Sequence, residues 1–179
     1  ILGLGVSGPQ VVEGWYGRPF SKPLARTREY IGIIRQVMER KGPVVNDGPH
    51  YPLPYTGEGA VGLGKPLKPI THPLRADLPV WLGAEGPRNV ALAGEIADGW
   101  LAVFHSARLA PLYEEWLAEG LSRPGARRSR EDFEVVTITV TTEEGTYVYT
   151  TTAGPPVTAG LCRHGQMVGP TYHILGRLA

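Results

Sequence analysis

Short continuous apolar runs alternate along this chain with segments in which apolar residues recur every three or four positions. The run at residues 80–82 is typical of a strand buried on both faces, and strands are also predicted at residues 1–6 and 100–103 and at the β-branched run 133–140. Helical spacing covers residues 23–40 and 109–122, and a third helix is predicted to begin at Pro87. Strands that alternate with helices favour an α/β fold with a parallel sheet and right-handed crossovers.

The two longer predicted helices each present one apolar face. The first is expected to be capped by Ser21 and to close at Gly42 and Pro43. Its apolar face comprises Leu24, Ile31, Ile34 and Met38. The second carries a stripe that we expect to lie in the core, comprising Leu109, Leu112, Tyr113, Trp116, Leu117 and Leu121.

Three other stretches do not follow this alternation. Residues 43–78 are rich in proline and glycine, with a turn signal at 46–48, and a loop of this length is usually functional or disordered. From residue 141 the chain turns to threonine and glycine, so we divide it into a domain over 1–140 and an unassigned tail over 141–179. Because Ile1 already belongs to a predicted strand, we expect the chain to begin partway through a larger fold.

Composition narrows the class of protein. The 179 residues carry a formal charge of +1, and no apolar run approaches the ~20 residues of a membrane span, so neither nucleic acid nor a membrane is an expected partner. The one cysteine, Cys162, cannot form an intramolecular disulfide, and the cytoplasm is the expected location. Acidic residues adjoin the arginines at 123, 127, 128 and 130, so this segment is interpreted as a solvated connection.

Residues 79–100 predict a strand, a glycine turn, a helix and a second strand. Gly83 and Gly86 leave room for close backbone approach, and Pro87 has no N–H to leave unsatisfied at the first helical position. The N–H groups of Ala84, Glu85 and Gly86 would point at an anion above the strand's carboxyl end, so this turn is a candidate phosphate site. The alternative is an ordinary βα turn whose glycines only permit tight packing.

The first residues contain a second glycine pattern. Gly3, Gly5 and Gly8 match the dinucleotide-binding spacing G-x-G-x-x-G, but we expect no helix between residues 9 and 19, and Glu29 lies within a helix rather than after a second strand. The favoured reading is that residues 5–8 end a barrel strand, where small residues admit a flat cofactor ring.

Candidate catalytic groups are few. His105 follows the predicted strand at 100–103, where catalytic groups sit in barrels, although a surface-loop histidine is the alternative. His50 and His72 lie in the long loop and are weaker candidates. No histidines or carboxylates have metal-ligand spacing, and Cys162 has no activating context, so no metal site and no nucleophile are predicted.

Five motifs in the right order resemble the luciferase-like monooxygenase superfamily, in particular its coenzyme F420-dependent oxidoreductases. They are LGLGVSGPQ at residues 2–10, EGWYG at 13–17, GLGKPLK at 62–68, WLGAEGP at 81–87 and ADGW at 97–100. The resemblance covers residues 1 to about 140 and implies a TIM-type (β/α)₈ barrel, present here as a partial barrel of about strands four to seven.

The resemblance also implies roles for individual residues. Residues at the first strand end would contact the deazaflavin ring, those of the glycine turn would hold its phosphate-bearing side chain, and Asp98 would be structural. The cofactor-binding set is therefore Gly5, Val6, Ser7, Gly8, Gly83, Ala84, Glu85, Gly86 and Pro87. His105 and Glu13, which lies in the second motif, are the catalytic candidates.

The implied function is hydride transfer between coenzyme F420 and a small organic substrate, with the protein orienting both and supplying a proton donor. One alternative is an FMN-dependent monooxygenase of the same superfamily. The other is a non-catalytic fragment whose exposed sheet edges mediate association, and a homo-oligomer is a further possibility that the sequence leaves open.

Overall fold

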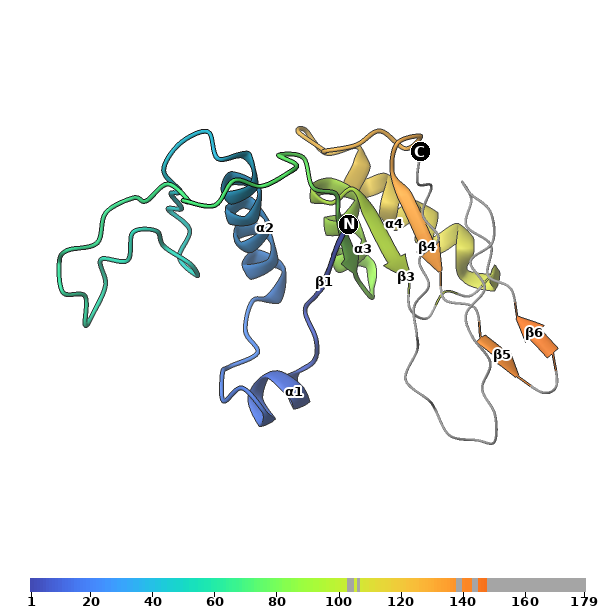
Figure 1. Cartoon of the computed structure of the whole chain (residues 1–179). Helices are drawn as coiled ribbons and strands as arrows, with labels where there is room; N and C mark the ends of the chain where they lie inside the picture. Colours follow the sequence, from blue (N-terminus) through green and yellow to red (C-terminus); the bar gives the residue numbers. More distant parts are fainter. Residues whose placement is uncertain (103–104, 106, 138–139, 143–144, 148–179) are drawn as a thin grey trace. The chain divides into compact units, whose positions relative to one another are not determined.

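The computed structural model describes residues 1–102, 105, 107–137, 140–142 and 145–147, and the chain divides into two compact units at residue 80 (Figure 1). Each unit is described by itself. Within the described residues, no helix is both long and apolar enough to cross a membrane.

The first unit begins with strand β1 (Leu2–Gly5), followed by helices α1 (Pro9–Gly14) and α2 (Pro23–Glu39). The remainder is the long loop that the sequence predicts, which runs without a helix or strand and is pinned by two isolated antiparallel bridges, Val44 with Leu67 and Asn46 with Leu53. Helix α1 corrects the expectation of no helix between residues 9 and 19, because Pro9 begins a helix of 6 residues directly after Gly8.

Helix α2 begins at Pro23, as expected, but its N-cap lies one residue after the predicted cap. Lys22, not Ser21, is the N-cap residue, with φ 47°, and no side chain caps the helix. Pro23 then occupies the first helical turn, where its missing N–H leaves no donor unsatisfied. Of the predicted apolar face only Ile31 is buried, whereas Leu24, Ile34 and Met38 are half-buried.

The second unit is built on a parallel sheet in the order β2 (Val80–Gly83), β3 (Gly99–Ala102) and β4 (Glu134–Thr137). The register pairs Leu82 with Trp100 and Trp100 with Val135. Helix α3 (Pro87–Ile96) connects β2 to β3, and a 3₁₀ turn, η1 (Ala107–Leu109), leads into α4 (Ala110–Leu121) before β4. This unit confirms the predicted alternation of strands and helices.

The last predicted strand, over 133–140, is shorter than expected. It ends at Thr137, and Val140 belongs to β5 (Val140–Thr142), which pairs antiparallel with β6 (Gly145–Tyr147). The rest of the tail, with Cys162, lies outside the described residues, so the proposed division at residue 140 stays a prediction.

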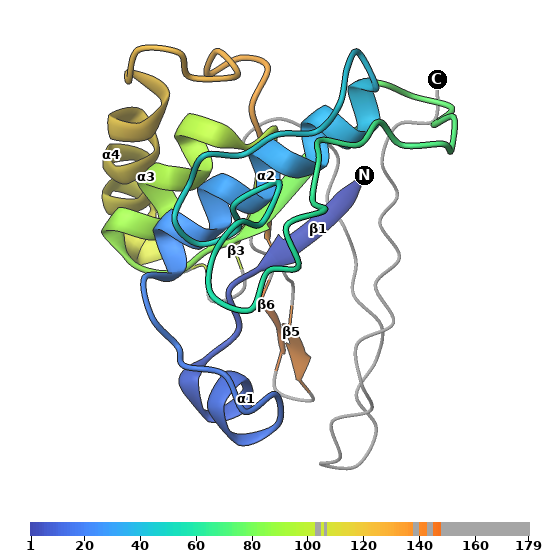
Figure 2. The same cartoon turned by 90° about the vertical axis from the view of Figure 1, so that its left-hand side faces the viewer.

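Helices α3 and α4 lie side by side, and two glycines set their separation (Figure 2). A Cβ on Gly120 would fall on the carbonyl oxygen of Ala91, and one on Gly94 would lie 2.8 Å from the carbonyl oxygen of Leu117.

The predicted apolar stripe of α4 lies only partly in the core. Tyr113 and Leu117 are buried, but Leu112 is exposed, as is Leu109 in the turn before the helix.

The arginine-rich segment connects α4 to β4 with none of residues 122–132 buried, but its arginines form ion pairs that the sequence did not predict. Arg127 and Arg128 donate from Nε to the same oxygen of Asp98, at 2.8 and 2.7 Å, and Asp98 is 4% exposed. Arg123 bonds Glu95 at 2.7 Å. The arginines therefore bind acidic residues on other elements rather than the acidic residues that adjoin them in the sequence. The buried carboxylate of Asp98 in particular requires charged partners.

We predict that Gly120→Ala lowers the free energy of unfolding by about 1–3 kcal/mol, because the added methyl group forces the α3 and α4 backbones apart. Gly32→Ala is the matched control: Gly32 lies mid-helix in α2 with open space at its Cβ position, so this change is expected to stabilise by up to about 1 kcal/mol. Urea unfolding of both variants checks the pair, and equal effects would refute the close-approach argument.

Candidate functional site

The turn between β2 and α3 has the backbone form that the sequence predicts for an anion cradle. Strand β2 ends at Gly83, Ala84 is buried, and Gly86 is the N-cap of α3 with φ 77° and ψ 161°, a conformation that is essentially restricted to glycine. Pro87 occupies the first helical turn, and that turn contains no acidic residue. The positive end of the helix dipole therefore faces the carboxyl edge of the sheet with no carboxylate in the first turn of the helix to neutralise it.

A buried tryptophan from the next strand fixes this turn. The indole N–H of Trp100 donates to the carbonyl oxygen of Ala84 at 2.8 Å, and Trp100 is 2% exposed. The same ring lies 5.4 Å from the ring of Tyr113 in α4 and 6.2 Å from the imidazole of His105, measured between centroids. The sequence marks Trp100 only as the last residue of a family motif, and its role in the turn was not foreseen.

His105 lies beyond β3 in this aromatic cluster, half-buried, with its ring centroid 5.1 Å from that of Tyr113. Burial of the imidazole lowers the pKa of His105, and the carboxylate of Glu114 opposes that effect. Because β2 and β3 are parallel, His105 and the turn at residues 83–87 follow the carboxyl ends of neighbouring strands. The structure thus brings two of the predicted site elements to one sheet edge.

Exposed and half-buried residues alternate along the end of β1 in the first unit. Gly3, Gly5 and Ser7 are exposed, whereas Leu4 and Val6 on the other face are half-buried. Ser7 has φ 58°, and a non-glycine residue in this left-handed region often marks a functional turn. This strand end therefore carries small residues on the exposed face, as expected for close approach by a flat ring.

Two observations in the sequence argue against a dinucleotide site at residues 3–8, and the structure contradicts the first and supports the second. Gly8 does open a helix, α1, directly. Glu29, however, lies on α2, and its carboxylate accepts hydrogen bonds from the side chain of Asn46 and from the N–H groups of His50 and Tyr51, at 2.9–3.1 Å. A carboxylate bound to its own loop does not bind a ribose, so the dinucleotide reading stays excluded.

Glu13 and the backbone of His50 take part in hydrogen bonds of the first unit. Glu13 is exposed, and its Oε1 accepts a hydrogen bond from the N–H of Phe20 at 3.1 Å, which closes the loop after α1. The backbone N–H of His50 donates a hydrogen bond to the carboxylate of Glu29, and His72 is exposed. A catalytic role for Glu13 stays a prediction.

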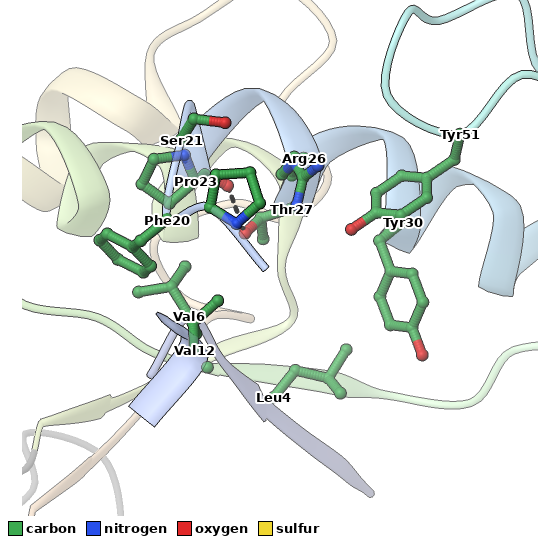
Figure 3. A pocket seen from close by; sticks show the side chains of 12 residues that line it. Leu4, Val6, Val12, Phe20, Ser21, Pro23, Arg26, Thr27, Tyr30 and Tyr51 are labelled. Carbon is green, nitrogen blue, oxygen red and sulfur yellow. Dashed lines mark hydrogen bonds between the residues drawn. The ribbon is translucent and has the colours of Figure 1, made fainter. Parts of the chain in front are cut away.

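The first unit also contains a cavity of about 270 Å³ that the sequence did not predict (Figure 3). Its walls come from β1, α1, the start of α2 and the long loop, which are too far apart in the chain for any spacing pattern to reveal. The lining residues are Leu4, Gly5, Val6, Val12, Pro19, Phe20, Ser21, Pro23, Arg26, Thr27, Tyr30 and Tyr51. Two predicted cofactor residues, Gly5 and Val6, are among them.

One cation at the turn was also missed. Arg88 follows Pro87 in the first turn of α3 and is exposed, so its guanidinium is placed to contribute to an anion site there. The signal was present in the sequence as the residue after the N1 proline.

The structure offers no candidate metal site, because the part of the chain that it describes holds no group of three or more His, Cys, Asp or Glu residues able to bind an ion.

Residues 1–143 match the family model described as luciferase-like monooxygenase. The chain belongs to this family. A luciferase-like relative from Mycobacterium tuberculosis, named as a coenzyme F420-dependent oxidoreductase, is 74% identical over 135 residues, which cover 75% of this chain and 39% of the relative. The 5,10-methylenetetrahydromethanopterin reductase of Archaeoglobus fulgidus is 32% identical over 136 residues, with coverages of 76% and 36%.

A solved structure has the same fold over most of the described chain. The coenzyme F420-dependent tetrahydromethanopterin reductase of Methanopyrus kandleri aligns with a TM-score of 0.60 and 25% identity, over 78% of this chain and 40% of that one. The α/β fold is thus that of part of a luciferase-like barrel, as the sequence predicts. The chain spans less than two fifths of the length of the two curated relatives described above.

We predict that an NMR titration of this luciferase-like chain gives His105 a midpoint below the ordinary value of 6.5, because burial disfavours the imidazolium. Glu114→Gln removes the opposing negative charge and should lower the midpoint further. Glu115→Gln, at the exposed neighbouring position, is the matched control and should leave it unchanged. A midpoint at or above 6.5 in the unaltered chain would contradict the assignment.

A second prediction concerns the anchor of the long loop. Burial raises the pKa of Glu29, but hydrogen bonds from Tyr51, Asn46 and His50 lower it more, so the net shift is downward from 4.5. The folded state therefore binds fewer protons at Glu29 than the unfolded state does. This contribution to stability is present above pH 4.5 and is lost as the pH falls through the lowered pKa.

Amide hydrogen exchange measures that anchor directly. Protection of the His50 and Tyr51 amides should fall as the pH drops below 4.5, and Glu29→Gln should remove most of it at neutral pH. Glu39→Gln, at the exposed end of the same helix, should change neither. If Glu39→Gln and Glu29→Gln behaved alike, the anchor would not depend on the Glu29 charge.

Proposed function

We propose that the chain is the cofactor-binding portion of a coenzyme F420-dependent oxidoreductase. The single observation that carries the proposal is the β2–α3 turn, whose glycine N-cap, N1 proline and Trp100 hydrogen bond form a fixed anion cradle. Family membership and a 74% identical relative named for this cofactor support the same reading.

The residues present fit a phosphorylated, flat cofactor at two places. At the turn, Gly86 leaves the helix N-terminus open and Arg88 adds a positive charge. The side chain of Glu85 is exposed, so only its backbone N–H is expected to serve the phosphate. At the end of β1, the exposed face of Gly3, Gly5 and Ser7 offers no bulky side chain against a ring.

The bound deazaflavin would supply hydride acceptance and donation, and the chain's own residues would provide orientation and proton handling. His105 is the candidate proton donor or acceptor. Its lowered pKa, which burial causes, favours the neutral imidazole at pH 7. The aromatic neighbours Trp100 and Tyr113 would hold the ring and exclude water.

An FMN-dependent enzyme of the same family is the second candidate, because the phosphate turn alone would also accept FMN. The two are separated by titrating the chain into coenzyme F420 and, in parallel, into FMN, while following fluorescence anisotropy. Tighter binding of coenzyme F420 is expected. Tighter binding of FMN would replace the first candidate with the second.

We predict that Gly86→Asp lowers the affinity for coenzyme F420 at least tenfold, because its carboxylate would lie where the phosphate is bound. Gly86→Asn is the matched control, since it introduces the same backbone strain at φ 77° without the charge. The aspartate should weaken binding clearly more than the asparagine does. Equal affinities for the two variants would locate the phosphate elsewhere.

A further inference from the structure

The cavity of the first unit has an apolar side and a polar side. Leu4, Val6 and Val12 line it from β1 and α1, whereas Arg26 and Thr27 line it from the beginning of α2 (Figure 3). Tyr30 and Tyr51 complete the wall, with ring centroids 5.9 Å apart. The cavity thus resembles a binding site for a molecule with an apolar body and one strongly polar group.

Arg26 identifies the polar group. Its Nε is buried and has no hydrogen-bond partner among the residues that the structure describes. The guanidinium carbon lies 5.8 Å from the centroid of the Tyr51 ring, which holds the group against the cavity wall. A buried arginine donor without an acceptor is costly, so the site favours a ligand that supplies an acceptor, best an anionic one.

The electrostatics of α2 point the same way. This helix of 17 residues has no acidic residue in its first turn and no side-chain cap, and Lys22 stands at its N-cap. Cations near the positive end of a helix dipole are unfavourable unless an anion neutralises them. The next acid along the helix, Glu29, does not serve, because its carboxylate is bound by the amides of the long loop.

We propose that this cavity binds a small organic carboxylate, with the acid group at Arg26 and the apolar body against Leu4, Val6 and Val12. Its volume of about 270 Å³ lies just below the ~300–1,000 Å³ of ordinary ligand pockets, which limits the ligand to a small molecule. Leu4 and Val6 line the cavity from the face opposite the exposed face of Gly3, Gly5 and Ser7, so the carboxylate site is separate from the ring site assigned under the proposed function.

The test uses benzoate as probe, with benzamide as its neutral isostere, inorganic phosphate as an anion without an apolar body, and the whole 179-residue chain. Binding is followed by the amide NMR shifts of Arg26 and Thr27. Benzoate should bind at least tenfold more tightly than benzamide and more tightly than phosphate. Equal binding of benzoate and benzamide, or tighter binding of phosphate, would overturn the proposal.

Two arginine substitutions test whether Arg26 binds the acid group of the probe. Arg26→Met should weaken benzoate binding at least tenfold and leave benzamide unchanged, whereas Arg28→Met, at an exposed position of the same helix outside the cavity, should alter neither. Val12→Phe, which fills the apolar side, should weaken both probes and keeps the test decisive if Arg26→Met does not fold. Benzoate binding that survives both Arg26→Met and Val12→Phe would place the ligand outside the cavity.

The two proposals can fail separately. If benzoate binds as described but coenzyme F420 does not, the carboxylate site stands and the proposed function fails. If coenzyme F420 binds but benzoate does not, the reverse holds. With both bound, saturating benzoate should leave the affinity for coenzyme F420 unchanged, and direct competition between them would overturn the assignment of benzoate to a separate site.

Discussion

One hydrogen bond connects the sheet of the second unit to its candidate chemistry. The Trp100 indole N–H donates to Ala84 inside the turn that follows the neighbouring strand, and its ring packs against His105 and Tyr113. A buried indole N–H without an acceptor is unfavourable, so the turn and the tryptophan determine each other's positions. The candidate anion cradle, the candidate proton donor and helix α4 therefore share one anchor.

Close packing behind that anchor gives it rigidity. Gly94 and Gly120 let the backbones of α3 and α4 approach, and Arg127 and Arg128 bind Asp98, the residue immediately before β3. Removing one partner of a buried ion pair leaves an uncompensated charge, so this cluster restricts where β3 can begin. A site that must orient a cofactor benefits from such supports, because small displacements at the reacting atoms reduce rates strongly.

The sequence predicted what depends on local pattern. Apolar runs and helical spacing located β2, α3, β3 and α4, and the residues at 83–87 predicted a βα turn with a glycine N-cap. Prediction failed where partners are distant in the chain. The acids that bind the arginines of residues 123–130 lie on other elements, and the 270 Å³ cavity combines residues from 4 to 51. Helix α1 was missed because its 6 residues are too few to establish a period.

If Trp100 holds the turn that we propose binds the cofactor, Trp100→Phe should lower the affinity for coenzyme F420. Trp81→Phe, a change at a second buried tryptophan in the adjacent strand, is the matched control for lost packing. Loss of one hydrogen bond is worth about 0.5–1.5 kcal/mol, so Trp100→Phe is expected to bind coenzyme F420 up to about tenfold more weakly than Trp81→Phe at similar thermal stability. Equal affinities for the two variants would show that the Trp100 hydrogen bond does not hold the cofactor site.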